Sequence, residues 1–552
     1  MAVALIFGLL WLGLDDEKTE PVTPPAADSA DLTLKLIVGE KLSAQDLGDI
    51  VESSPANTEE AAELPSLLVE EAPDVAVKGL FRRWRAPAVK PAPRTSETRG
   101  FLGNGSAIFT HSSPPRTWSK TQNIRWVKPM DSWSNSSPVI TDGKVFTTSE
   151  PLSLLCLDAE TGALLWKREG DFASTLDEEA REKLSAFLGK ARDLAVEMEK
   201  KQRELYRLKR ALRKNKGTPE LVGKMKALEE EVNEMRAQVS EMDRFREPPP
   251  MEFIGYSAST PVTDGVSIYA VFGNGVVTRF DLDGNRLWST WLGDPVRPMN
   301  GNDRGHASSP ILRDGVLVVG YGKVLALDAT TGALKWQTSR VFRDYGTSGF
   351  MSLGGRDVVV KPDGELIDLQ TGESLNAPLD DLYYLGPHVV GDRVFFMGSS
   401  TESQSAREEV SIGRAFRYSL SETGKAVATR LWDVPLEYRY YFTAPILDDQ
   451  TLFHVSGDGQ LRAYNAEDGS VTHTLDLPPN LKEPVDVYPS PVLVGGLLYI
   501  TSDMGTTAVF DPAKSSVVSV NRLEEKMRST PTFSDGRLFI RTFENLYSIG
   551  AD

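Results

Sequence analysis

The chain has 552 residues, too many for one compact core, so several domains or a repeat array are expected. Its net charge of −17 at pH 7 argues against nucleic-acid binding through a general basic field. The single cysteine, Cys156, excludes an internal disulfide, a thiolate metal cluster and a redox pair.

The N-terminal part divides into an apolar start and a long polar segment. Residues 1–14 are almost continuously apolar but shorter than the roughly 20 residues that span a bilayer. We interpret them as a signal anchor whose start is clipped; an apolar cytoplasmic tail is the alternative. Residues 15–98 are rich in Pro, Ala, Glu and Ser, and we expect a mostly disordered linker that holds the folded body away from a membrane.

A strongly charged segment, residues 175–247, has a helical period. Apolar residues recur at steps of four and three in its first half, and an uninterrupted heptad seam runs through residues 221–242. Residues 215–217 break the pattern, and Thr218 followed by Pro219 is typical of a helix start. The segment is therefore predicted to be an antiparallel coiled-coil hairpin inserted into the rest of the chain.

The turn of this predicted hairpin gathers basic residues. They are Arg207, Arg210, Arg213, Lys214 and Lys216. A solvated basic tip is one interpretation, and a contact site for a partner or an anionic surface is the other.

The remaining chain repeats one pattern. Each copy begins with Ser/Thr-Pro or its equivalent, continues through a strand, a tight turn such as Asp142-Gly143 and further strands, and in several copies reaches a Trp. Eight copies begin near Ser137, Thr260, Ser309, Gly349, Gly386, Ala444, Ser490 and Thr530. Four short strands per copy, at about 40–55 residues each, are typical of propeller blades. We predict an all-β, eight-bladed β-propeller, with a closing strand and blade 1 in residues 99–174 and blades 2–8 in residues 248–552.

The two ends of this array are predicted to meet in one blade. The eighth copy stops three strands in, at residues 546–549, without a Trp-bearing outer strand. A suitable strand, residues 123–127 with Trp126, precedes the first copy. Because pairing them would satisfy two open strand edges, we expect the N-terminal strand to close the ring.

The repeat resembles a known family. Leu-Asp-x-x-Thr-Gly-x-x-x-Trp, at residues 157–166 and 327–336, resembles the PQQ-like repeat of quinoprotein propellers, and residues 101–105 resemble the lead-in of exported PQQ-like repeat proteins of environmental bacteria. In such propellers the repeat Trp packs between blades. The resemblance therefore implies a structural role for Trp126, Trp166, Trp288, Trp336 and Trp432.

The resemblance leaves the activity open. Quinoprotein alcohol dehydrogenases of this kind bind PQQ with Ca²⁺, often beneath a disulfide of adjacent cysteines that one cysteine cannot form. We find no Asp/Glu/Asn set that matches their calcium ligands, and the five histidines have no metal-ligand spacing. We therefore assign no catalytic or metal residue and expect no cofactor; PQQ with calcium is the alternative.

The repeat also predicts a candidate site. The loop that enters each innermost strand falls at the same face of the ring, near the central channel, in every blade. The residues that precede the Ser/Thr-Pro position are mostly aromatic: Trp133, Tyr256, His306, Tyr345, Tyr384, Tyr441, Tyr488 and Arg528. They are expected to line a funnel mouth that binds a flat ligand or a peptide; packing of the rings between blades is the alternative.

The leading hypothesis is a non-catalytic binding or scaffold propeller of the cell envelope, tethered to the inner membrane by residues 1–14 and binding envelope proteins rather than nucleic acid. It is similar to the lipoprotein propellers that assist outer-membrane β-barrel assembly and share the repeat without a cofactor. The alternatives are a PQQ-dependent dehydrogenase of alcohols or sugars and a polysaccharide-binding or sensing propeller.

Overall fold

The structure is a computed structural model of the chain. It describes residues 99–109, 115–176, 178–214, 218–240, 253–293, 306–339, 345–379, 382–383, 386–400, 411–436, 442–457, 459–476 and 487–550. The predicted anchor and linker, residues 1–98, lie outside the described residues.

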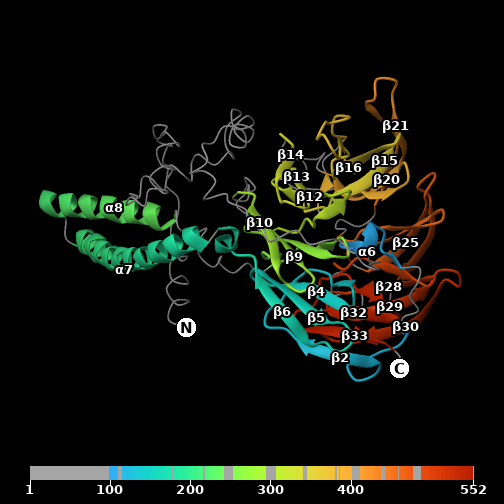
Figure 1. Cartoon of the computed structure of the whole chain (residues 1–552), viewed down its shortest axis with the longest axis horizontal. Helices are drawn as coiled ribbons and strands as arrows, with labels where there is room; N and C mark the ends of the chain where they lie inside the picture. Colours follow the sequence, from blue (N-terminus) through green and yellow to red (C-terminus); the bar gives the residue numbers. More distant parts are fainter. Residues whose placement is uncertain are drawn as a thin grey trace. The chain divides into compact units, whose positions relative to one another are not determined.

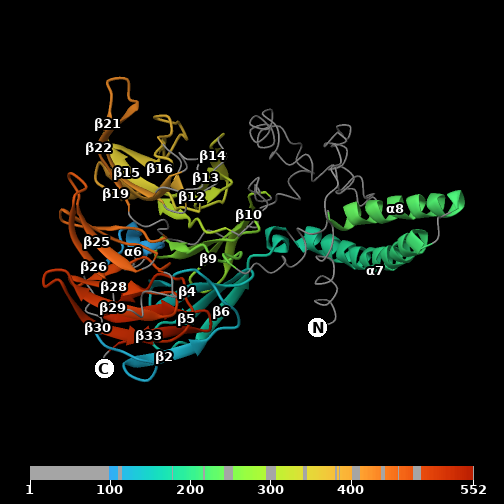
Figure 2. The ribbon, with the colours of Figure 1, turned by 180° about the vertical axis from the view of Figure 1, so that it is seen from behind.

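Eight sheets form an eight-bladed β-propeller, as the sequence repeat predicts (Figures 1 and 2). From the inner strand outward, blade 1 contains Val139–Thr141 (β3), Lys144–Ser149 (β4), Ser153–Asp158 (β5) and Leu164–Glu169 (β6), and blade 2 contains Val262–Thr263 (β7), Ser267–Val271 (β8), Val276–Asp281 (β9) and Arg286–Trp291 (β10). Blade 3 contains Ile311–Arg313 (β11), Val316–Tyr321 (β12), Lys323–Asp328 (β13) and Leu334–Gln337 (β14). Blade 4 contains Gly349–Leu353 (β15), Arg356–Val360 (β16) and Leu366–Asp368 (β17).

Blades 5 to 8 complete the ring. Blade 5 contains His388–Val390 (β19), Arg393–Ser400 (β20), Ser411–Leu420 (β21) and Ala426–Pro435 (β22), and Leu382–Tyr383 (β18) also pairs with β20. Blade 6 contains Ile446–Asp448 (β23), Thr451–Val455 (β24), Gln460–Asn465 (β25) and Val471–Asp476 (β26), and blade 7 contains Val492–Val494 (β27), Leu497–Thr501 (β28), Thr506–Asp511 (β29) and Ser516–Arg522 (β30). Blade 8 contains Thr532–Ser534 (β31), Arg537–Arg541 (β32) and Asn545–Ile549 (β33). Ile108–Phe109 (β1) joins blade 7, and Ile124–Pro129 (β2) joins blade 8.

The predicted closure is confirmed. Strand β2 pairs antiparallel with β33, so the N-terminal strand is the outer strand of blade 8. Trp126 faces Ser548 in this pairing.

Blade 4 differs from the expected four strands. After β17 the chain makes only an isolated bridge, between Ile367 and Ser374, and the described residues of this blade form a three-stranded sheet. The long strands of blade 5 cover its outer side, because the Ala426 amide donates to the Leu375 carbonyl at 2.9 Å and the Tyr418 hydroxyl to the Gly364 carbonyl at 2.9 Å.

Tryptophans on outer strands join neighbouring blades, as the resemblance implies. Each indole Nε1–H donates to a carbonyl of the next blade: Trp126 to Ala159 at 3.0 Å, Trp166 to Leu282 at 3.1 Å, Trp288 to Ala329 at 3.0 Å, Trp336 to Leu369 at 2.9 Å and Trp432 to Ala466 at 3.0 Å. A glycine of the next blade lies against each ring, since a Cβ added at Gly162 would stand 2.7 Å from Trp126.

A second series of bonds joins the blades at their inner strands. The amide of the Ser/Thr-Pro position of one blade donates to the side-chain hydroxyl of the next: Ser137 to Thr260 at 3.1 Å, Thr260 to Ser309 at 3.0 Å, Ser309 to Thr347 at 3.0 Å, Ala444 to Ser490 at 2.9 Å, Ser490 to Thr530 at 3.1 Å and Thr530 to Ser137 at 3.0 Å. We call this series the hydroxyl belt. Gly386 in blade 5 and Ala444 in blade 6 have no hydroxyl, so the belt cannot continue through blade 5.

Two long helices follow blade 1. A 3-10 turn, Phe172–Thr175 (η2), leads into Glu178–Lys214 (α7), and Pro219–Ser240 (α8) begins at the predicted Pro219, where the Leu221 amide donates to the Thr218 hydroxyl at 3.4 Å. Leu205 of α7 packs with Leu228 and Val232 of α8. Among the described residues, no helix is long and apolar enough to cross a membrane.

Candidate functional site

The central channel of the propeller contains a cavity of about 1880 Å³. Every blade contributes to its wall the residue at its Ser/Thr-Pro position or the equivalent: Ser137, Thr260, Ser309, Thr347, Gly386, Ala444, Ser490 and Thr530. The motif that identifies the repeat therefore has two roles, since its hydroxyls join the blades and its backbone encircles the cavity.

A segment that precedes the propeller enters this channel. We call residues 99–109 the channel segment; it includes the short helix Leu102–Gly105 (α6) and β1. The Thr263 amide of blade 2 donates to the Arg99 carbonyl at 2.8 Å, and the Leu493 amide of blade 7 donates to the Ala107 carbonyl at 2.9 Å. The segment thus contacts inner strands on both blades, and β1 runs parallel to β27.

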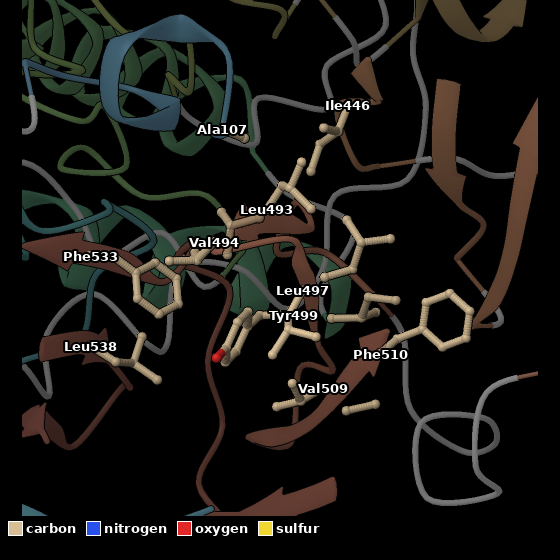
Figure 3. Packing of buried hydrophobic residues seen from close by; sticks show 14 of the residues in the cluster. Ala107, Ile446, Leu493, Val494, Leu497, Tyr499, Val509, Phe510, Phe533 and Leu538 are labelled. Atoms are coloured by element: carbon tan, nitrogen blue, oxygen red, sulfur yellow. The ribbon is translucent and has the colours of Figure 1, made fainter. Parts of the chain in front are cut away.

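The channel segment packs into the core of blades 7 and 8. Leu102, Ala107 and Phe109 belong to the same buried cluster as Leu493 and Phe533, and the rings of Phe109 and Phe533 lie 5.5 Å apart. Figure 3 shows Ala107 beside Leu493 and Val494 in this cluster. On this side of the ring, the inner strands β27 and β31 are fully buried.

The opposite side of the channel is open. All three residues of β11 in blade 3 are only half-buried, as are Gly349 and Phe350 of β15 and two residues of β19. The whole of β11 lines the cavity here, together with Gly349 and Phe350 of β15 and His388 and Val389 of β19. We call this wall, formed by β11, β15 and β19, the open wall.

An arginine surrounded by aromatic rings lies at the mouth of the cavity. The Arg528 guanidinium lies 4.1 Å from the ring centre of Phe253, 5.0 Å from that of Tyr488 and 5.7 Å from that of Phe543. Tyr488 also stacks on Phe442, with ring centres 4.6 Å apart. Because Phe253 precedes blade 2 whereas Tyr488 precedes blade 7, this aromatic cluster reaches from one side of the mouth to the other.

Three of the predicted mouth residues, Tyr345, Tyr488 and Arg528, line the cavity. The other three described residues pack against protein. Trp133 lies 5.4 Å from the Phe543 ring, and Tyr256 belongs to the buried cluster between blades 1 and 2. His306 packs against the Tyr321 ring at 5.2 Å, and burial lowers its pKa to about 4.

Tyr384 and Tyr441 lie outside the described residues. Sequence reasoning missed Phe253, Phe442 and the channel segment. Phe442 follows Tyr441 directly, so a search that allows the repeat spacing to vary by one residue would have identified it. Nothing in the spacing of the repeat pointed to the other two, because both lie in connections outside the repeated unit.

Two of the aspartates that line the cavity already have side-chain partners. Asp264 accepts a hydrogen bond from the Tyr269 hydroxyl at 2.9 Å, and Asp357 accepts one from Arg313 at 3.0 Å. The Ser352 hydroxyl and Arg313 hold the pKa of Asp357 below its ordinary value. Within the described part of the chain, no three His, Cys, Asp or Glu residues gather as a metal site would require.

The basic tip of the helical insertion is described in part. Arg207 and Arg210 of α7 are exposed. Arg213 and Lys214 form the end of α7, and Lys216 lies outside the described residues. Among the side chains that the structure describes, ion pairs connect α7 and α8: Lys201–Glu231 at 2.5 Å, Lys209–Glu229 at 2.7 Å and Lys224–Glu204 at 3.5 Å.

Comparison with known proteins identifies a related family. The family model described as outer membrane protein assembly factor BamB matches residues 82–196, 249–375 and 386–518. No curated protein matches the sequence.

Solved structures also resemble the chain. BamB from Moraxella catarrhalis is 12% identical, covering 78% of this chain and 98% of its own, with a TM-score of 0.44. Quinohemoprotein alcohol dehydrogenase ADHIIG from Pseudomonas putida HK5 is 11% identical, covering 80% and 79%, with a TM-score of 0.43. A europium-containing methanol dehydrogenase is 10% identical, covering 80% and 89%, with a TM-score of 0.45.

Proposed function

Because the chain belongs to the family of the outer membrane protein assembly factor BamB, we propose that it is a non-catalytic binding propeller of the cell envelope. Its central channel holds a segment of a protein partner. The single observation that carries this proposal is the open wall, a stretch of half-buried inner strands that faces a cavity of about 1880 Å³.

The size and the chemistry of the cavity favour a polymer over a small substrate. Small-molecule pockets usually measure about 300–1,000 Å³, well below this volume. The wall offers backbone amides, hydroxyls and apolar side chains, and two of its aspartates, Asp264 and Asp357, are already bonded to neighbouring side chains. A protein segment uses such a surface through backbone hydrogen bonds and apolar contacts.

The family description suggests which partner to test first. We propose that unfolded outer-membrane proteins are bound during their assembly. In the test, a urea-unfolded outer-membrane β-barrel protein is diluted into a solution of the purified full-length chain, and co-sedimentation of the two proteins is measured. A soluble complex of the two is the expected result, and separate migration of the two proteins would overturn the proposal.

The competing dehydrogenase function has its own test. Protein incubated with PQQ and Ca²⁺ is examined for quinone absorbance and for reduction of a dye with alcohols or sugars. We expect neither, because the sequence has no Asp/Glu/Asn set that matches the calcium ligands of the quinoprotein dehydrogenases. Uptake of PQQ with dye reduction would replace the binding proposal with the enzyme.

We further propose that α7 and α8 form a coiled-coil hairpin that acts as a second contact arm, with a basic tip of Arg207, Arg210, Arg213, Lys214 and Lys216. The apolar contact of Leu205 with Leu228 supports it.

We also propose that residues 1–14 tether the protein on the periplasmic side of the inner membrane. Fractionation of cells into membrane and soluble fractions, with and without these residues, tests the tether.

A further inference from the structure

The channel segment shows how an inner strand of this propeller can hold an extended chain. The two amides that bind it, from Thr263 and Leu493, occupy the same place in the repeat, two residues after the proline that starts the inner strand. Thr263 binds the Arg99 carbonyl in blade 2, and Leu493 binds the Ala107 carbonyl in blade 7.

The strand pairing within blade 7 explains why the Leu493 amide faces the channel. In blade 7, Val494 pairs with Leu497 across a two-residue turn. The residues that close such a turn exchange both of their hydrogen bonds, and the next pair along the ladder exchanges none. The amide and carbonyl of Leu493 therefore point away from β28, toward the centre of the ring.

Leu312 occupies this place in blade 3. It follows Pro310 by two residues, and Arg313 pairs with Val316 across the Asp314-Gly315 turn, so the Leu312 amide also points toward the channel. No channel segment covers it: Leu312 lines the cavity, and all three residues of β11 are half-buried. Where the equivalent strand β27 is paired with β1, all of its residues are buried.

The surroundings of Leu312 suit a strand with small or apolar side chains. Ile311 and Phe350 line the same wall and are partly buried, and the Arg313 guanidinium lies 4.6 Å from the centre of the Phe350 ring. Arg313 is also paired with Asp357, so its positive charge is neutralised within the wall. A partner with alternating apolar and small polar residues, as in a β-strand, matches this surface.

We propose that β11 accepts an extended polypeptide strand of the partner by the backbone pairing through which β27 holds β1. This inference rests on the proposed function and deepens it, because it names the partner as an unpaired β-strand and Leu312 as its main backbone anchor. The strand lies parallel to β11 within the cavity, beside the channel segment.

The probe is a short fluorescent peptide of alternating valine and threonine with lysines at both ends, measured by fluorescence polarisation on the full chain. Its twin has the same sequence with alternate amides N-methylated and cannot form a β-ladder. We expect the peptide to bind and the twin to bind at least about tenfold more weakly, since the lost hydrogen bonds each contribute free energy.

A pair of matched variants locates the site. Leu312→Pro removes the backbone N–H that faces the channel. Because this N–H makes no hydrogen bond to β12, the substitution leaves the pairing within the blade intact. It should weaken peptide binding about tenfold. Leu447→Pro is the control, because Leu447 holds the same place in β23 of blade 6 but does not line the cavity. Equal binding to wild type and Leu312→Pro would overturn the inference.

Hydrogen exchange on the wild-type chain gives a second readout if Leu312→Pro does not fold. The peptide should slow exchange of the Leu312 amide; unchanged exchange contradicts the inference. The two proposals fail differently. If the unfolded outer-membrane protein still co-sediments with Leu312→Pro as with wild type, the binding function stands and the strand site is wrong; if it does not bind wild type, the function itself fails.

Discussion

Single residues join the blades of this ring through one repeated geometry. A tryptophan on an outer strand donates its indole N–H to the next blade, and its ring covers a glycine there, as Trp126 covers Gly162. Each of these glycines has a positive φ, +71° at Gly162, and leaves no room for a side chain. Glycine is therefore required at this position for two reasons: its backbone has a positive φ, and a side chain would collide with the tryptophan ring.

Two glycines of blade 1 separate these requirements. Gly143 has φ +69° and open space around it, whereas a Cβ at Gly162 would stand 2.7 Å from the Trp126 ring. Gly143→Ala should cost about 1–2 kcal/mol from backbone strain alone. Gly162→Ala should cost about 1–3 kcal/mol more, because the ring must move. Urea unfolding of both variants checks this, and equal losses would show that the tryptophan contact adds no constraint.

At the scale of elements, the strands could be predicted from the sequence and the contents of the channel could not. Ser/Thr-Pro, Asp-Gly and the tryptophans recur with the blades, so their period predicts eight sheets, and the unmatched end of the eighth copy predicts β2. The channel segment and Phe253 belong to no repeat. Their positions depend on packing against β27 and Arg528, which sequence period does not encode. For the same reason, Tyr256 and His306 share their spacing with Tyr488 but do not line the cavity: Tyr256 is buried, and His306 packs against the Tyr321 ring.

The helical insertion gives a prediction at this scale. In the first variant, a short Gly-Ser linker replaces residues 190–240. This variant retains η2 and Leu184, because Leu184 packs on Phe172 and Leu176. We expect the melting temperature of the propeller to change by only a few degrees, because insertions at surface connections are tolerated. A deletion that also removes Leu184 should be more damaging. A large loss in the first variant would mean that the distal helices support the ring.

The stability of the whole molecule should depend on three histidines with lowered pKa values, in blades 3, 5 and 6. Burial lowers the pKa of His306 and His388 to about 4 and that of His454 to about 3. In the unfolded chain their pKa is about 6.5, so between pH 6.5 and 4 only the unfolded state takes up these protons. The free energy of unfolding must therefore fall as the pH falls through this window.

Urea unfolding at pH 7 and pH 5 measures this loss. Each histidine should contribute roughly 2 kcal/mol of it. Burial raises the pKa of Glu150, and this opposes the loss, because the folded state then binds a proton more readily. His388→Gln should reduce the difference between the two pH values by about one histidine's share. An unchanged difference in this variant would show that His388 already carries its proton in the folded state.

The closure of the ring also sets the order in which the protein can mature. The Trp118 amide binds the Asn521 side chain across 403 residues of sequence, and Arg541 binds the Ser132 carbonyl across 409. Strand β2 and the channel segment are synthesised before any blade, whereas their partners β33 and β27 come near the end of the chain. A growing chain therefore exposes an unpaired N-terminal edge until blade 8 is complete, and such edges invite aggregation. Strand β2 and the channel segment thus gain their pairing strands only when blades 7 and 8 have been made, and the proposed binding of a partner in the channel requires the closed ring.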